Sequence, residues 1–492
     1  MLWKPFVIIG FLINILLAPQ GGLAAELLVG TAVADITPAE PVAVSGQFHL
    51  RIAKKVETPI TANVIALESY EADSSFDIAI MVSCDLLYIP SEVLERVRKA
   101  VRTSLPSIDT RKIFLNGTHT HTAPVLLCDK YPIPEEGVMQ VEEYLSFLVK
   151  QVTDAIVQAW YRRSRGSVTW GLSHAVVAYN RRAVYADGSA QMYGKTDTVE
   201  FLNLEGYEDH DVNTLFFWND LGQLIGVVIN ASCPSQEVES RSVVNADFWH
   251  PVREALRERY GEQLCVLAWT GASGDQSPHL MYRKAADERM RKLRSLNRLD
   301  EIARRIVRAV DDAYETVKKD RHTSVPLIHK VETIKLPMRL VTEAEYTEAK
   351  EAVEKAAAQI KQNAEAAVRE YRRMKWYERT VNRFEQQRIE SKPEYEMELH
   401  VLRIGDVAIC TNSFELFTDY GIRMKARSKA IQTFVVQLVG SGTYLPTEKA
   451  IRGGHYSAIV HSSLVGPEGG NLLVNRTLNI INSLWTESDR VP

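Results

Sequence analysis

The chain has 492 residues, of which 46% are hydrophobic and 24% charged, and its formal net charge at pH 7 is −4. This composition is typical of a globular protein and excludes a fibrous or largely disordered chain. The small negative charge gives no electrostatic basis for binding nucleic acid.

The first 25 residues have the three-part pattern of a secretory signal peptide. Lys4 precedes an apolar run over residues 6–17, and small residues follow up to Ala24 and Ala25. The apolar run is short for a membrane span, although an uncleaved anchor is the alternative. We expect cleavage near Ala24 or Ala25 and a secreted or periplasmic mature protein.

Five cysteines are few for an exported protein of this size, and their number is odd. A core this large needs no disulfide framework. Cys84, Cys265 and Cys410 lie in apolar, strand-like runs, and we expect them to be buried thiols.

Predicted strands and helices alternate along the chain, which predicts an α/β (or α+β) fold with mixed β-sheets flanked by helices. Ser91 is the expected N-cap of the first helix. No repeat or linker divides residues 26–492, so we expect a single large domain. Strands are expected at 27–38, 61–68, 76–84, 113–115, 168–177, 212–218, 224–229, 265–269, 398–404, 407–411 and 433–439, and helices at 91–104, 140–163, 247–260, 417–426 and 469–485.

Residues 342–390 differ from the rest of the chain in being rich in Ala, Glu, Lys and Arg. Apolar residues recur at seven-residue spacing at Val353, Ile360, Ala367 and Met374, which predicts one or two long helices. We interpret this stretch as a helical insertion that packs on the core. It either lies over the functional site or serves as a plain structural strut.

The segment Asn116-Gly117-Thr118-His119-Thr120-His121-Thr122-Ala123-Pro124 follows a short buried-strand pattern. On an extended backbone alternate side chains share a face, so His119 and His121 are expected to point the same way. Two such imidazoles can bind a metal, or one can bind while the other transfers protons. A pair of hydrogen-bonded structural histidines is the alternative.

Polar or ligand-capable residues repeatedly follow apolar strands, and loops at strand ends are where scaffolds usually hold their chemistry. This pattern predicts one site built from several loops. The residues concerned are His119, His121, Arg181, Cys233, Ser277, Glu415 and Tyr444.

Several segments together resemble the catalytic domain of the neutral (non-lysosomal) ceramidase family, a group of zinc-dependent amidases. The resemblance runs from Gly30 to about Tyr456 and is loose between motifs. The matching segments are Val29-Gly30-Thr31-Ala32 with Asp35-Ile36-Thr37, Gly117-Thr118-His119-Thr120-His121 with Pro124, Asn180-Arg181, Gly274-Asp275 with Ser277-Pro278, Phe414-Glu415, and the tyrosines Tyr444 and Tyr456.

The resemblance implies a Zn²⁺ ion bound by His119, Glu415 and Tyr444. Where the family has a second ligand histidine, this chain has Cys233 in Ala-Ser-Cys-Pro-Ser. Thiolate is a good zinc ligand, so we expect Cys233 to take that place. Two alternatives stay open: His250 reaches in from the next helix, or the site has lost its metal.

The resemblance also implies four catalytic residues. Ser277 stands at the position of the family's nucleophile, and a nearby zinc ion would lower the pKa of its hydroxyl. His121, Arg181 and Tyr456 would position the substrate carbonyl and stabilise the oxyanion. Asp275, beside the serine, is expected to cap its turn or orient a neighbour.

The leading hypothesis is an exported zinc-dependent hydrolase that cleaves a linear amide, with an N-acyl lipid giving fatty acid and amine. One alternative is a zinc amidase or esterase acting on a non-lipid acyl substrate such as an N-acylated sugar or peptide. Another is a non-catalytic binding protein on a decayed hydrolase fold. Contact with a membrane surface stays open, and the sequence does not give the oligomeric state.

Overall fold

The structure, a computed structural model, describes residues 25–71 and 74–486. The predicted signal peptide lies outside the described residues, except for Ala25, which begins the first strand and pairs with Val325. Within the described ranges, no helix is both long enough and apolar enough to cross a membrane.

The larger sheet has nine strands in the order β14-β13-β12-β7-β1-β4-β5-β6, with β16 beside β1. Its neighbours are mostly antiparallel, but β5 pairs with β6, and β13 with β14, in parallel. The strands are β1 (Ala25–Asp35), β4 (Thr61–Glu71), β5 (Ser74–Cys84), β6 (Ile113–Gly117), β7 (Ser164–His174), β12 (Asp211–Asn219), β13 (Leu224–Ala231), β14 (Cys265–Thr270) and β16 (Ser324–Val325).

A second sheet packs face to face against the first. It has the order β17-β18-β19-β21, and its last two strands are parallel. Ile65 and Leu267 of the first sheet share one buried cluster with Ile409 and Phe434 of the second. The strands are β17 (Leu327–Pro337), β18 (Glu394–Ile404), β19 (Val407–Thr411) and β21 (Gln432–Val436).

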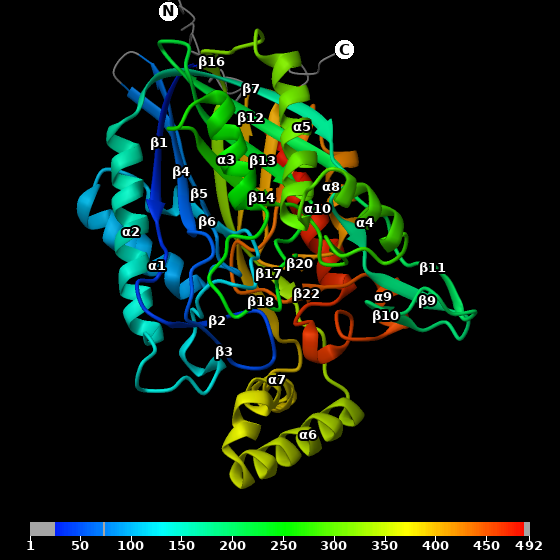
Figure 1. The fold of residues 1–492 in the computed structure, drawn as a ribbon. Coiled ribbons are helices and arrows are strands. Elements are labelled where there is room, and N and C mark those ends of the chain that lie inside the picture. Colours follow the sequence, from blue (N-terminus) through cyan, green and yellow to red (C-terminus); the bar gives the residue numbers. More distant parts are fainter. Residues whose placement is uncertain (1–24, 72–73, 487–492) are drawn as a thin grey trace, which may run out of the picture.

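Helices cover the outer faces of both sheets (Figure 1), which confirms the predicted single large α/β domain. Two helices pack on β1, β4 and β5, two on β12, β13 and β14, and two on the second sheet. In that order they are α1 (Ser91–Ser104), α2 (Val141–Tyr161), α3 (Trp249–Tyr260), α5 (Arg298–Val317), α8 (Thr418–Arg427) and α10 (Pro467–Ser483). The N-cap prediction for Ser91 is wrong, because Pro90 holds that position and no side chain caps α1.

Short strands pair segments that are distant in the sequence. β8 pairs with β15, which brings Tyr179 opposite Ser277. The backbone N–H of Arg181 donates to the Asp275 carbonyl next to this pair. β20 pairs with β22 in parallel, which sets Glu415 opposite Tyr444. The remaining elements are β2 (Val42–Val44), β3 (Arg51–Ala53), β8 (Tyr179–Asn180), β9 (Arg182–Tyr185), β10 (Ala190–Met192), β11 (Phe201–Leu204), β15 (Gln276–Ser277), β20 (Glu415–Leu416), β22 (Tyr444–Leu445), α4 (Lys284–Leu293) and α9 (Glu448–Gly453).

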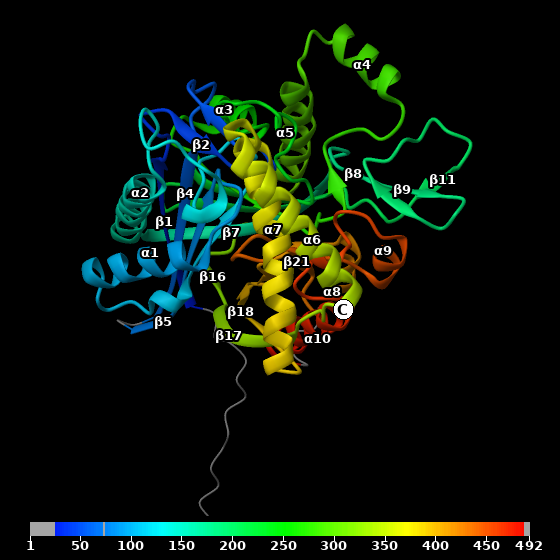
Figure 2. The same ribbon diagram turned by 90° about the horizontal axis from the view of Figure 1, so that it is seen from below.

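The Ala/Glu/Lys/Arg-rich stretch forms two helices, α6 (Glu343–Gln362) and α7 (Ala364–Ile389), with only Asn363 between them. Thr342 caps α6 in a reciprocal capping box with Glu345. Both helices lie at the end of the molecule near β2 and β3 (Figure 1), and Figure 2 shows α7 running across that end.

Two buried histidines link β17 and β18 at the core. His329 Nε2 lies 2.9 Å from His400 Nδ1, and His400 Nε2 lies 2.8 Å from Glu398 Oε1. Burial lowers the pKa of both histidines below 6.5, and the two rings lie close enough for the His400 charge to lower that of His329 further. Both imidazoles are therefore neutral at pH 7.

We predict that the His329→Gln variant loses less stability than the wild type between pH 7.5 and pH 5.0 in urea unfolding. A lowered histidine pKa means that the unfolded chain binds protons that the folded chain does not. The free energy of unfolding therefore decreases as the pH is lowered through about 6.5. One such histidine contributes up to ~2 kcal/mol to this loss at pH 5. Equal losses in the two proteins would contradict the assignment.

Candidate active site

The polar residues expected to form one site lie at one edge of the two sheets. His119 and His121 follow β6, and Glu415 and Tyr444 follow the parallel strands β19 and β21. These four residues and Tyr456 line a cavity of about 650 Å³. Five of the eight predicted site residues therefore meet in one cavity, because strands that run in the same direction deliver their loops to the same edge.

The two histidines of the motif meet, but not as residues of an extended strand. β6 ends at Gly117, and His119 has a left-handed backbone with φ 70°. The expectation of a shared strand face is wrong, yet the turn brings His119 Nε2 within 3.4 Å of His121 Nε2. His119 Nδ1 lies 2.9 Å from the carbonyl oxygen of Leu87, to which its N–H donates. The lone pair of His119 Nε2 is therefore left for the cavity.

Glu415 is the acidic partner of His119 in the cavity. Its Oε2 lies 3.5 Å from His119 Nε2 and 4.0 Å from Nη2 of Arg181. Burial alone would raise the pKa of Glu415, but the charges of His119 and Arg181 and hydrogen bonds, including one from Tyr444, lower it below its usual value. Burial and the Glu415 charge raise the pKa of Tyr444, so that a carboxylate stands beside a protonated phenol.

Arg181 lies directly behind this group and is 1% exposed. Its guanidinium donates to the Gly274 carbonyl at 2.9 Å and to the Tyr444 hydroxyl at 3.3 Å. It also donates to the Tyr193 hydroxyl at 3.0 Å and to Gln236 Oε1 at 3.1 Å. One buried cation therefore connects four loops of the site.

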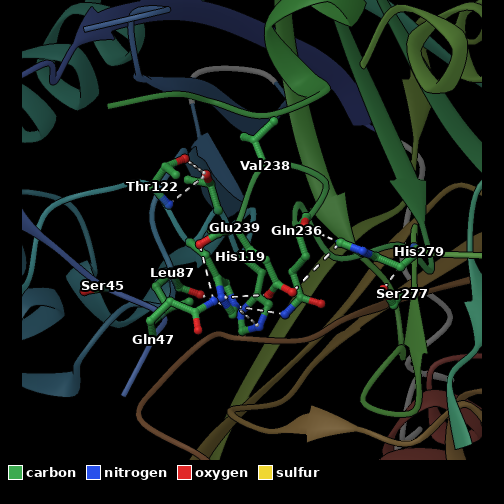
Figure 3. A network of polar contacts seen from close by, with 12 residues as sticks. Ser45, Gln47, Leu87, His119, Thr122, Gln236, Val238, Glu239, Ser277 and His279 are labelled. Carbon is green, nitrogen blue, oxygen red and sulfur yellow. Dashed lines mark hydrogen bonds and ion pairs between the residues drawn. The ribbon is translucent and has the colours of Figure 1, made fainter. Parts of the chain in front are cut away.

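Gln236 and Glu239, which the sequence pattern did not indicate, hold His121; Figure 3 labels Gln236 and Glu239 beside His119. Gln236 Nε2 donates to His121 Nε2 at 2.8 Å, and Glu239 Oε2 lies 3.2 Å from His121 Nδ1. Burial, followed by the charges of His119 and Arg51, lowers the pKa of His121 well below 6.5, so its imidazole is neutral. The signal in the sequence was a polar residue three positions after Cys233, in the same loop.

The structure does not bring Cys233 together with His119. Its Sγ lies 3.5 Å from the Val177 carbonyl, in a buried cluster with Phe248 and Trp249. Burial and the Asp247 charge raise the pKa of the thiol. His250, on α3, is also not among the cavity-lining residues. The ligand role expected of Cys233 would require its side chain to turn away from Val177.

Ser277 is fully buried and lines neither this cavity nor a second one of about 960 Å³ beside it. Its Oγ accepts hydrogen bonds from the Tyr193 hydroxyl and from the backbone N–H of His279, both at 3.0 Å. The His279 imidazole instead lies 2.7 Å from the Gln236 carbonyl, so it forms no Ser-His pair (Figure 3). Tyr193 connects Ser277 to Arg181.

Asp275 has the structural role expected of it, over a longer range. One oxygen accepts from the backbone N–H and hydroxyl of Thr418 at the start of α8, at 2.8 and 2.7 Å. The other accepts from the Asn180 side chain at 3.0 Å. Asp275 therefore ties the serine turn both to α8 and to the segment that carries Arg181.

A zinc ion at this site would have His119, Glu415 and the phenol of Tyr444 as its donors. Over residues 25–71 and 74–486, no group of three or more His, Cys, Asp and Glu side chains is arranged to hold a metal. The 3.5 Å between His119 Nε2 and Glu415 Oε2 is close to the ~3.3 Å expected between neighbouring ligands of a tetrahedral zinc. The cavity supplies the open fourth position of a catalytic site.

Comparisons with known proteins agree at the level of the fold. No model of a protein family matches the chain, and no curated protein matches it either. The chain is similar to the crystal structure of neutral ceramidase from Pseudomonas aeruginosa, with a TM-score of 0.67 and 16% identity over 94% of this chain and 74% of that chain. A structure of a ceramidase complexed with C2 has a TM-score of 0.66 and 15% identity over 95% and 76%. The chain therefore has a ceramidase-like fold.

We predict that Gly46→Ala lowers the melting temperature by at least about 1 °C more than Gly137→Ala. Both glycines have positive φ, at 103° and 71°, so either substitution strains the backbone by about 1 kcal/mol. Only at Gly46 would the new Cβ collide with His121, at 2.4 Å from its Cγ, whereas the same position at Gly137 is open. Equal melting temperatures would show that His121 is free to move.

Proposed function

We propose that this protein is an exported, zinc-dependent hydrolase that cleaves the linear amide bond of an N-acyl substrate, as a ceramidase does. The observation that carries the proposal is the convergence of His119, Glu415 and Tyr444 at one cavity on a ceramidase-like fold, with Arg181 buried behind them. The proposal of export rests on the predicted signal peptide.

Two buried groups of the site, the Arg181 guanidinium and the Tyr456 hydroxyl, can stabilise a developing oxyanion. Arg181 is a buried, fixed cation, and burial with the Glu415 charge raises the pKa of Tyr456 to about 12. Tyr456 is therefore a protonated phenol at pH 7, with its ring centroid 5.7 Å from that of Tyr444. We infer that Arg181 and Tyr456 orient the substrate carbonyl and stabilise the negative charge that develops on its oxygen.

The residues at the histidine end of the cavity provide for the cofactor and for proton transfer. His119, Glu415 and Tyr444 would hold the zinc ion, which when bound polarises a carbonyl or activates a hydroxyl. Gln236 and Glu239 hold His121 as a neutral imidazole beside His119. We infer that His121 positions the carbonyl and takes part in moving protons.

For zinc, we predict about one equivalent per chain in the wild type, loss of most of it in Glu415→Gln, and retention in Cys233→Ser. Glutamine keeps the volume of Glu415 but removes the negative charge that a cation needs, whereas Cys233 Sγ is turned toward Val177. Metal analysis of dialysed protein measures all three. Zinc lost from Cys233→Ser and kept by Glu415→Gln would show that the ligand set is wrong.

For the nucleophile, we predict that Ser277→Ala is folded and inactive, while Ser273→Ala remains active. Both serines are buried, but Ser277 connects through Tyr193 to Arg181, whereas Ser273 donates to the Gly271 carbonyl. Turnover of an N-acyl amine, with circular dichroism as the check on folding, distinguishes them. Turnover retained by Ser277→Ala would assign the attack to water instead.

For the substrate, a panel of fluorogenic N-acyl sphingosines and N-acetyl sugars tests the lipid assignment. We expect the N-acyl lipids to be cleaved to fatty acid and amine. Turnover of the sugars alone would favour the non-lipid amidase. Well-folded, zinc-loaded protein that cleaves no member of the panel would favour a binding protein on a hydrolase fold.

A further inference from the structure

Helix α7 forms one wall of the cavity that holds His119 and Glu415. Its residues Arg372, Lys375, Trp376, Glu378 and Arg379 line that cavity. Of the two helices of the 342–390 stretch, α7 therefore contributes to the cavity as well as packing on the body.

A row of aromatic rings leads along this wall to the site. The Trp376 ring lies 5.5 Å from that of Phe48 and 5.8 Å from that of Tyr456, and the Tyr456 ring lies 5.7 Å from that of Tyr444. Tyr444 neighbours Glu415 through the β20–β22 pair. An apolar part of a substrate can lie along these rings, between α7 and the reacting carbonyl.

The acidic residues that line the cavity, other than Glu415, interact with cations other than Lys130, Arg372 and Arg379. Glu92 and Glu142 both pair with Arg96, at 2.7 and 2.5 Å. Glu378 pairs with Lys375 at 2.9 Å, and the Asp129 charge acts on the same lysine.

Three cations of the wall have no carboxylate partner within 4 Å in the part of the chain that the structure describes: Lys130, Arg372 and Arg379. The Lys130 ammonium lies 4.3 Å from the Tyr88 ring, and the Arg372 guanidinium lies 6.0 Å from the Tyr131 ring. Burial, followed by the charges of Arg372 and Arg379, lowers the pKa of Lys130. Burial and the Arg372 charge lower that of Arg379 to about 10. These cations repel one another, and an anion among them would relieve the repulsion.

The rest of α7 shows that this lack of partners is not a general property of the helix. Arg369, Arg373 and Lys375 each have a glutamate three or four residues away at 4.0, 3.9 and 2.9 Å. Arg383 donates to the carbonyl oxygens of Val460 and Arg339. Arg383 thus also lacks a carboxylate partner in the described part of the chain, but its guanidinium is occupied by backbone carbonyls. The cavity-facing Arg372 has the Tyr131 hydroxyl as a hydrogen-bond partner, and neither Arg372 nor Arg379 has a carboxylate partner among the described residues.

We propose that Lys130, Arg372 and Arg379 form a subsite for an anionic group of the substrate, a carboxylate, phosphate or sulfate. Guanidinium groups bind such anions through paired, charge-assisted hydrogen bonds. The proposal rests on the proposed function, and it narrows the substrate to an N-acyl amine whose apolar part lies along the aromatic row and whose anion meets α7. Neutral N-acyl amines would then be the poorer substrates.

Kinetics on three substrates with the same acyl chain test the subsite: N-dodecanoylglycine, N-dodecanoylethanolamine phosphate and neutral N-dodecanoylethanolamine. For the wild type we expect kcat/KM at least tenfold higher on one or both anionic substrates than on the neutral one. The Arg372→Gln/Arg379→Gln variant should lose that ratio through KM, while the control Arg369→Gln keeps it. The two anionic substrates distinguish a carboxylate from a phosphate. A wild-type ratio near one, or a ratio unchanged in the double variant, would overturn the proposal.

Binding without turnover separates this proposal from the proposed function. We expect dodecyl phosphate to bind the wild type at least tenfold more tightly than dodecanol in calorimetry, and the double variant to lose that difference. If this holds and no amide is cleaved, the subsite stands and the hydrolase assignment fails. If amides are cleaved but the two ligands bind the wild type equally, the subsite is wrong.

Discussion

The buried guanidinium of Arg181 is the interaction on which the arrangement of the site depends. A charge taken out of water is stabilised by hydrogen bonds, and the two terminal nitrogens of Arg181 donate to the Gly274 carbonyl, Gln236, Tyr193 and Tyr444. The four partners come from loops that are far apart in the sequence. If Arg181 were displaced, these loops would lose their common anchor.

Close backbone packing enforces the same arrangement. At Gly274 an added Cβ would lie 2.3 Å from the Glu415 carbonyl, so the serine turn and the strand that presents Glu415 touch directly. Asp275 adds hydrogen bonds to Thr418 and Asn180 on the same two sides. Arg181, Glu415 and Tyr444 are therefore positioned by main-chain contacts as well as by their own side chains, which favours a preorganised site.

Much of the fold could be predicted from the sequence, because long apolar runs and amphipathic periods identify strands and helices locally. The 327–337 strand was missed, although apolar residues that alternate with charged ones such as Lys330 and Glu332 are typical of a half-buried strand. The position of the histidine motif at the end of a strand was predicted correctly. The reason why His119 and His121 lie close together was predicted wrongly. A left-handed backbone at His119, which the pattern of the strand does not indicate, turns the two rings together.

The remaining features of the site depend on tertiary structure. Spacing alone could not show that Cys233 turns into an apolar cluster while Gln236 of the same loop reaches His121. The helical periodicity of residues 364–389 also could not show that this helix lines the cavity of the site. The two solved ceramidases share the fold at 16% and 15% identity, so the chemistry of this chain has to be argued from its own residues.

The most direct test of this account is the steady-state kinetics of Arg181→Lys on an N-acyl amine that the wild type cleaves. Lysine keeps the charge but cannot donate to four partners at once. The account predicts a folded protein whose kcat falls by about a hundredfold or more, as for the loss of an oxyanion donor. A kcat equal to that of the wild type would contradict the central role of Arg181.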